Sequence, residues 1–161
     1  MKKMSRIVST VTKLIFGYIV IFGFYVIIYG HVTPGGGFQG GVVVASAFAL
    51  LLVTYGHDKT EEFLNTNVLS FAESTGLLLF IVLAFLGLGA SFFYNFLSKS
   101  GGLFGHLPVI GVNPGDVYTG GLIPLMEIAV GLEVLSAMGI IILVISGGAA
   151  QKFKEKEKEN S

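Results

Sequence analysis

Residues 14–56 read LIFGYIVIFGFYVIIYGHVTPGGGFQGGVVVASAFALLLVTYG, and this stretch contains no Asp, Glu, Lys or Arg. About 20 consecutive apolar residues in an α-helix cross the hydrocarbon core of a bilayer. The stretch is long enough for two such helices around a short connection. We expect spans at about residues 11–29 and 36–55, with Pro34 and the adjacent glycines making the reversal, because neither residue type continues a helix cheaply.

The composition of the whole chain also indicates a membrane protein. Apolar residues make up 53% of the chain and charged residues only 12%, whereas about a quarter of the residues in a soluble domain are charged. Two later apolar runs predict further spans at about residues 68–94 and 122–145. We therefore expect an all-α, polytopic membrane protein with a single four-helix domain over residues 1–150 and a charged tail over residues 151–161.

The chain contains no cysteine, and its ten basic residues balance its ten acidic residues. The lack of cysteine excludes disulfides, thiol chemistry and iron–sulfur ligation by this chain. The balanced charge gives no indication of nucleic acid as a partner. We predict no cofactor. We also predict no metal site, because the expected topology places His57 on the other side of the membrane from His31 and His106. A site formed by His31 and His106 alone is the alternative.

The basic residues are distributed unevenly between the two sides of the expected bundle. One side carries Lys99 alone, and all the other Lys and Arg residues lie on the opposite side. Because short cytoplasmic loops carry an excess of basic residues, we expect both termini in the cytoplasm and residues 96–121 outside. Tyrosines fall at the expected span ends, as interfacial aromatic residues do: Tyr29, Tyr55, Tyr94 and Tyr118.

The long outer loop combines glycines with an apolar run at residues 107–112. The sequence that follows the run predicts a β-turn with Pro at the second position and Gly at the third: Asn113, Pro114, Gly115 and Asp116. We expect the apolar run to pack on helix ends or on a partner. A re-entrant segment covered by protein is the alternative.

The segment from Gly30 to Gly41, GHVTPGGGFQGG, is the most unusual in the chain. Its glycines match the G-x-G-x-x-G spacing of dinucleotide sites, but that fingerprint needs a preceding β-strand, and here a span-length helix precedes it. We interpret the segment as a tight hairpin, with Thr33 and Pro34 at the entrance of the second helix. Small residues then recur at every fourth position and let another helix approach this face closely: Gly37, Gly41, Ala45 and Ala49.

Glu127 and Glu133 interrupt the last apolar run. A carboxylate inside a bilayer costs about 2.5–3.5 kcal/mol, so each needs a partner or a polar cavity. Six residues of helix separate the two by about 9 Å and about 240°, which excludes a carboxylate dyad. We expect each to pair with a neighbouring subunit or to belong to an ion or proton path, with Glu133 near the midplane as the stronger candidate.

Two other ionisable residues lie at span ends. His31 follows the C-terminal end of the first span, where the helix dipole favours positive charge, and it is therefore a further candidate for proton exchange. The alternative for His31 is a solvated loop residue. Glu73 lies in the first turns of the third span, where the helix N-terminus favours an acid, and we interpret it as structural.

The glycine segment carries a family resemblance through the pattern Gly30-His31-x-x-Pro34-Gly35-Gly36-Gly37-Phe38-x-Gly40-Gly41. After one span, this pattern resembles the B-type subunit of the Mrp-type multisubunit cation/proton antiporters. Related subunits occur in the membrane arms of energy-converting hydrogenases and sulfur reductases. The resemblance covers about residues 10–147, including Glu127-Ile-Ala-Val-Gly-Leu-Glu133-Val, and the family often has an acid or amide at the position of Glu127. Glu133 departs from the family pattern.

The resemblance implies an accessory subunit of a Na⁺/H⁺ antiporter module in a prokaryotic cell membrane, either alone or within a hydrogenase or sulfur-reductase complex. It implies no enzyme activity of this chain by itself and no cofactor. Neighbouring membrane subunits, Na⁺, H⁺ and lipid would be the partners. Two alternatives are a purely structural scaffold, whose glutamates pair with basic residues of neighbours, and a self-contained oligomeric channel or small transporter.

Overall fold

In the part of the chain that the structure describes, four helices are long and apolar enough to cross a membrane. The computed structural model describes residues 5–87, 91–98, 100–106 and 117–159. The spans are α1 (Arg6–Ile28), α2 (Gly37–Tyr55), α4 (Thr66–Phe85) and the first part of α5 (Ile123–Glu159). Two short elements complete the described part of the chain: α3 (His57–Phe63) and the 3₁₀ helix η1 (Val117–Thr119).

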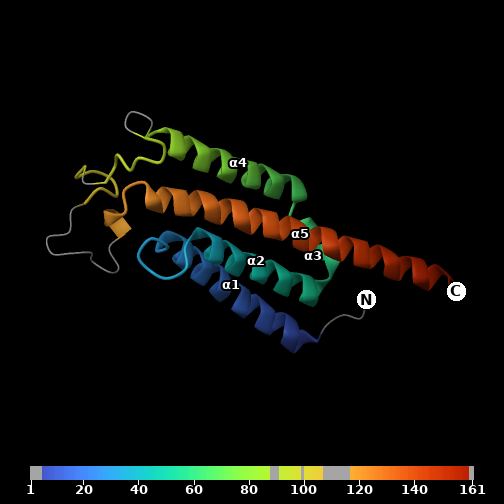
Figure 1. Cartoon of the computed structure of the whole chain (residues 1–161). Helices are drawn as coiled ribbons and strands as arrows, with labels where there is room; N and C mark the ends of the chain where they lie inside the picture. Colours follow the sequence, from blue (N-terminus) through green and yellow to red (C-terminus); the bar gives the residue numbers. More distant parts are fainter. Residues whose placement is uncertain (1–4, 88–90, 99, 107–116, 160–161) are drawn as a thin grey trace.

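The four long helices form a bundle in which α2 and α5 are central (Figure 1). Helix α2 packs against both α1 and α5, and α5 also packs against α4. The start of α1, the short α3 and the end of α5 lie at one end of the bundle, and the loops between α4 and α5 lie at the other. We call these the terminal end and the loop end.

Local sequence explains where two of the four spans begin. Ser5 caps α1 by accepting a hydrogen bond from the amide of Val8 at 3.3 Å, and Asn65 caps α4 through the amide of Asn67 at 2.9 Å. Side chains of this kind satisfy amide groups that have no partner inside the helix. Helix α2 has no side-chain cap of its own. Gly56, with a φ of 83°, separates α2 from α3 because this left-handed backbone favours glycine.

Glycines bring each central helix into close contact with an outer helix. A Cβ atom on Gly40 of α2 would lie 2.8 Å from the carbonyl oxygen of Gly23 on α1. On α4, a Cβ atom on Gly76 would lie 2.8 Å from the carbonyl oxygen of Ala129 on α5. Such small residues let helix backbones approach each other, which is how helices associate in a solvent as apolar as their own side chains.

The third span is shorter than the sequence predicted. We expected a helix over residues 68–94, and α4 ends at Phe85. The chain turns back on itself there, because the amide of Phe93 donates to the carbonyl oxygen of Ala84 at 3.1 Å with Phe93 at a φ of 62°. Tyr94 consequently belongs to this returning loop and does not mark the end of a span.

Other boundaries also differ from the prediction. Helix α1 begins at Arg6 rather than at residue 11, and α5 continues to Glu159 through the charged tail. Lys and Glu are good helix formers, so the tail extends the helix instead of ending it. The short α3 was not predicted. The turn expected at residues 113–116 and the apolar run at residues 107–112 lie outside the described residues.

Candidate functional site

The carboxylate of Glu127 meets the first turn of α2. The backbone amide of Gly37, the first residue of α2, donates a hydrogen bond to Oε2 of Glu127. The two residues are distant in the sequence but meet at the loop end, where the start of α2 lies beside the start of α5 (Figure 1). Since α2 has no side-chain cap from its own sequence, α5 supplies the capping oxygen that the helix lacks.

Glycines make room for this carboxylate. A Cβ atom on Gly36 would lie 2.9 Å from Glu127 Oε2, and one on Gly30 would lie 3.1 Å from the same oxygen. Gly36 also has a φ of 91°, which L side chains rarely adopt. The glycine segment thus forms a backbone cradle around the carboxylate, in which any larger residue would occupy the space of the carboxylate oxygen.

The electrostatics of the cradle favour an anion. The N-terminus of a helix carries partial positive charge, and free amide groups there point at an approaching anion. There is no acidic residue in the first turn of α2 itself. Glu127 therefore supplies both the hydrogen-bond acceptor and the negative charge that this helix end favours.

Glu127 corrects one expectation from the sequence. We expected both carboxylates of the last span to need a partner outside the chain, and Glu127 finds its partner inside it. The reason is the fold: the hairpin between α1 and α2 turns the exposed amides of the α2 N-terminus towards α5. The sequence signal for this contact was the joint occurrence of a glycine cluster and a lone acid, both near the same end of their spans.

A pocket of about 350 Å³ opens beside the cradle. It is bordered by the α2 N-terminus, by α4 and by the first turns of α5. Its lining is mostly apolar, and among the described residues that form it Glu127 carries the acidic group. The lining comprises Gly35, Gly36, Gly37, Phe38, Gln39, Phe80, Ile123, Met126, Glu127 and Val130.

Glu133 has a different environment from Glu127. It is half-buried on α5, and its backbone contacts α4, since a Cβ atom on Gly76 would lie 2.8 Å from the nitrogen of Glu133. Ten residues separate it from the start of α5, which is a rise of about 15 Å and therefore about half of the hydrocarbon core. Within the described residues, its carboxylate has no hydrogen bond or ion pair.

His31 is half-buried, although it lies in the loop between α1 and α2. It packs against Gly120, where an added Cβ atom would lie 2.7 Å from the His31 ring. Both of its ring nitrogens are buried, and neither has a hydrogen-bond partner among the residues that the structure describes. His57 lies at the terminal end, where its Nδ1 is 2.8 Å from Ser146 Oγ and its Nε2 is 3.2 Å from Glu61.

The small-residue stripe of α2 faces a helix of the same chain. A Cβ atom on Gly41 would lie 3.0 Å from the carbonyl oxygen of Gly131 on α5, and one on Gly37 would meet the carbonyl oxygen of Glu127. Ala45 is 1% exposed and Ala49 is half-buried. The sequence predicted that another helix approaches this face, and at Gly37 and Gly41 that helix is α5 of the same chain.

The sequence predicted Thr33 and Pro34 at the entrance of α2, but the two residues do not form its first turn. The helix begins later, at Gly37. The backbone amide and the hydroxyl of Thr33 both donate to the carbonyl oxygen of Tyr29, at 2.9 and 3.0 Å. These residues therefore close the C-terminal end of α1, and the entrance of α2 is made by glycines with positive φ.

Comparisons with known proteins show the family to which the chain belongs. A family described as a domain related to the MnhB subunit of Na⁺/H⁺ antiporters matches residues 7–151. The chain is 34% identical over 129 residues to an uncharacterized protein of Methanocaldococcus jannaschii, covering 79% of this chain and 47% of that protein. It thus spans about half the length of that relative.

Two further relatives carry antiporter names. The chain is 37% identical over 111 residues to the Na⁺/H⁺ antiporter's B-type subunit from Bacillus subtilis, covering 68% of this chain and 74% of that protein. It is 31% identical over 152 residues to a protein of Staphylococcus haemolyticus provisionally named antiporter subunit mnhB2, covering 92% of this chain and 99% of that protein. The chain therefore belongs to the family of domains related to the MnhB subunit of Na⁺/H⁺ antiporters.

Proposed function

We propose that this chain is an accessory subunit in the membrane part of a multisubunit Na⁺/H⁺ antiporter. Its relatives in Bacillus and Staphylococcus are named as subunits, and a subunit needs neighbours. In this proposal Glu133 belongs to the path of the cation or proton. Glu127 serves mainly to hold the α1–α2 hairpin against α5.

The observation that carries the proposal is the contrast between the two carboxylates. Glu127 is matched by the N-terminus of α2. Glu133 lies about halfway across the span, and within the described chain nothing matches its charge. Ionisable residues at such depth generally face a partner or a water-filled path, because bare lipid would leave their charge unsolvated. The partner or the path must then be completed by another subunit.

The extent of exposed apolar surface supports the presence of neighbours or lipid around the chain. Only 17% of the α1 span and 22% of the α4 span are buried within the structure. Large apolar side chains cover the exposed faces of these two helices, among them Ile21, Phe22, Phe71 and Leu78. A purely structural scaffold would use the same surfaces. The ion-path role and the scaffold role therefore make the same prediction for the surface and different predictions for Glu133.

Replacing Glu133 by Gln in the assembled complex tests the proposal. Gln keeps the size and the hydrogen-bonding capacity of the side chain and removes its ability to carry charge. We expect assembly to persist and Na⁺/H⁺ antiport, measured by pH-sensitive dye in everted vesicles, to fall at least tenfold. Glu62→Gln, on the exposed surface of α3, is the matched control. If the Glu133→Gln complex assembles and its antiport equals that of the control, Glu133 does not belong to the ion path and the scaffold role is supported.

Two further measurements separate the remaining alternatives. The purified chain alone in liposomes should give no cation or proton exchange, whereas a self-contained channel or transporter would give it. The genes beside this one distinguish the parent complexes: hydrogenase or sulfur-reductase subunits would indicate a respiratory assembly, and antiporter subunits alone would indicate a stand-alone antiporter.

A further inference from the structure

A groove of about 750 Å³ opens between α1, α2 and α3 at the terminal end of the bundle. It lies at the opposite end of the bundle from the Glu127 cradle, and nothing in the proposed function uses it. Helix α1 contributes Lys13 and Phe16 to its lining, α2 contributes Leu51 and Tyr55, and α3 contributes Lys59, Thr60, Glu62 and Phe63.

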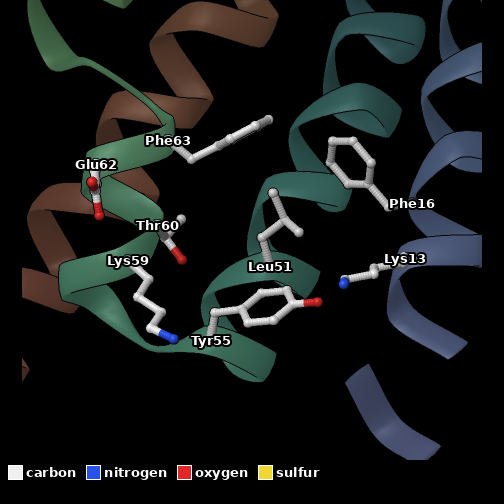
Figure 2. A pocket seen from close by; sticks show the side chains of 8 residues that line it. All are labelled: Lys13, Phe16, Leu51, Tyr55, Lys59, Thr60, Glu62 and Phe63. Atoms are coloured by element: carbon white, nitrogen blue, oxygen red, sulfur yellow. The ribbon is translucent and has the colours of Figure 1, made fainter. Parts of the chain in front are cut away.

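The polar residues gather at the outer side of the groove. Figure 2 shows Lys13 and Lys59 approaching from opposite sides, with the ring of Tyr55 between them. The hydroxyl of Tyr55 is held 3.0 Å from Ser9 Oγ, so the ring is fixed in this position. Two cations thus flank one opening, and both attract an anion that enters it.

The inner side of the groove is apolar. Leu51 lies one turn before Tyr55 on α2, and Phe16 lies about one turn after Lys13 on α1, so both point to greater depth in the bundle. The rings of Phe16 and Phe63 meet edge to face with centroids 6.4 Å apart and close the inner end between α1 and α3. The groove therefore changes from charged to apolar along its length.

Among the described residues, no ion pair engages the lysines of the groove, Lys13 and Lys59. Glu62 also lines the groove, but Figure 2 shows it on the side of α3 that is turned away from Lys13. Two lysines against one glutamate leave the opening with an excess of positive charge.

Two residues of the groove indicate that it lies near the level of the lipid headgroups. Tyr55 is the last residue of α2, and tyrosines favour the boundary between lipid and water. Lys13 lies about two turns inside the start of α1, from where a long side chain reaches towards that boundary while its stem covers apolar surface. The groove thus has a charged opening near the water and an apolar part towards the bilayer core. A phospholipid has its phosphate and its acyl chains in the same order.

We propose that this groove binds one anionic phospholipid. The phosphate lies at the opening that Lys13 and Lys59 flank, beside the ring of Tyr55, and one acyl chain runs along Leu51 towards Phe16 and Phe63. An anionic headgroup is favoured over a zwitterionic one because the latter carries its own ammonium group, which cancels the attraction of the two lysines. Basic pockets between transmembrane helices select lipid headgroups by the same chemistry.

Native mass spectrometry of the purified full chain tests the proposal. The chain is released from micelles containing equal amounts of phosphatidylglycerol and phosphatidylcholine with identical acyl chains. We expect one phosphatidylglycerol to be retained in preference. The double variant Lys13→Gln/Lys59→Gln should bind it about thirtyfold more weakly, since each lysine near an anionic lipid contributes about fivefold. Circular dichroism checks that the variants keep their helix content.

Matched variants distinguish a site from general charge attraction. Arg6→Gln/Lys152→Gln removes the same charge from exposed positions outside the groove lining and should leave retention unchanged. Leu51→Trp should fill the apolar part and lower the retention of phosphatidylglycerol without changing the charge. Equal losses in both double variants, or no preference for phosphatidylglycerol, would overturn the proposal.

Further measurements of this kind also test two other occupants of the groove, which are inorganic phosphate and a neighbouring subunit. If millimolar inorganic phosphate displaces phosphatidylglycerol as well as added phosphatidylglycerol does, the groove is a phosphate site and the acyl chain plays no part. If Lys13 and Lys59 crosslink to a carboxylate of a neighbouring subunit in the assembled complex, and phosphatidylglycerol is absent there, the groove is a protein contact. Either result would replace the lipid.

Discussion

The amide of Gly37 on α2 and the carboxylate of Glu127 on α5 are joined by a hydrogen bond at the loop end of the bundle. One contact thereby fixes the α1–α2 hairpin against the final helix and places a negative charge at the positive end of the α2 dipole. The glycines around it leave no space for a Cβ atom. The most distinctive segment of the sequence therefore serves a carboxylate in its own chain.

Removing the Glu127 carboxylate should destabilise the chain. Hydrogen bonds to charged groups contribute about 1.5–3 kcal/mol, so Glu127→Ala should lower the free energy of unfolding by about that amount. Glu127→Gln keeps an acceptor oxygen and should cost less. Unfolding in mixed micelles, followed by circular dichroism, measures both. Glu62→Ala on α3 is the control, and a Glu127→Ala value equal to that control would contradict the capping role.

Gly76, the single glycine of α4, should not tolerate a larger residue. An added methyl group would lie 2.8 Å from backbone atoms of both Ala129 and Glu133, which cannot rotate away. We expect Gly76→Ala to cost about 1–3 kcal/mol, the usual penalty of overpacking. The control is Gly148→Ala on α5, where nothing lies within 4 Å and the better helix propensity of Ala should stabilise slightly. Equal effects of the two substitutions on the melting temperature would show that α4 and α5 are not in close contact.

A buried hydrogen bond joins α1 to α2 at the terminal end. The hydroxyls of Thr12 and Thr54 are 2.8 Å apart, and the two residues are 3% and 7% exposed. Interhelical hydrogen bonds in membranes average about 0.6 kcal/mol in double-mutant cycles. A cycle of Thr12→Val, Thr54→Val and the double variant should give a coupling energy of that size. A coupling of zero within error would mean that each hydroxyl finds another partner in the micelle.

Ser136 should tolerate loss of its hydroxyl. Its side chain is 0% exposed on α5, and its Oγ has no hydrogen-bond partner among the described residues. A buried polar group without a partner costs about 1–3 kcal/mol, so Ser136→Ala should be neutral or stabilising in the isolated chain. Thermal unfolding of the purified chain measures this. A clear destabilisation would reveal a bound water or a partner group at this position.

The orientation of the bundle can be tested directly because the natural chain has no cysteine. A cysteine at Ser100, in the loops between α4 and α5, should react from outside with a membrane-impermeant thiol reagent. A cysteine at Glu62 on α3 should react only after permeabilisation. Both positions are exposed in the structure, so a difference reports the side of the membrane. The reverse labelling pattern would place the termini outside.

The positions of the spans were largely readable from hydropathy. Three of the four spans were predicted close to where they lie, because a membrane requires long apolar helices and little else in the sequence satisfies that requirement. The third failed at its C-terminal end. The residues after Phe85 stay apolar while the chain turns back through Phe93, and hydropathy does not distinguish a lipid-facing helix from an apolar loop.

The sequence by itself determined the number of spans, the small-residue face of α2 and the two acids of the final helix, since each follows from local composition and helical period. Only the tertiary structure decided what those features meet. It placed α5, rather than another subunit, against Gly37 and Gly41, and it turned the amides of α2 towards Glu127 while leaving Glu133 without a partner in the described chain. The physical reason is that hydropathy and period fix how a helix sits in lipid, whereas the contacts between residues ninety positions apart depend on which helices pack side by side.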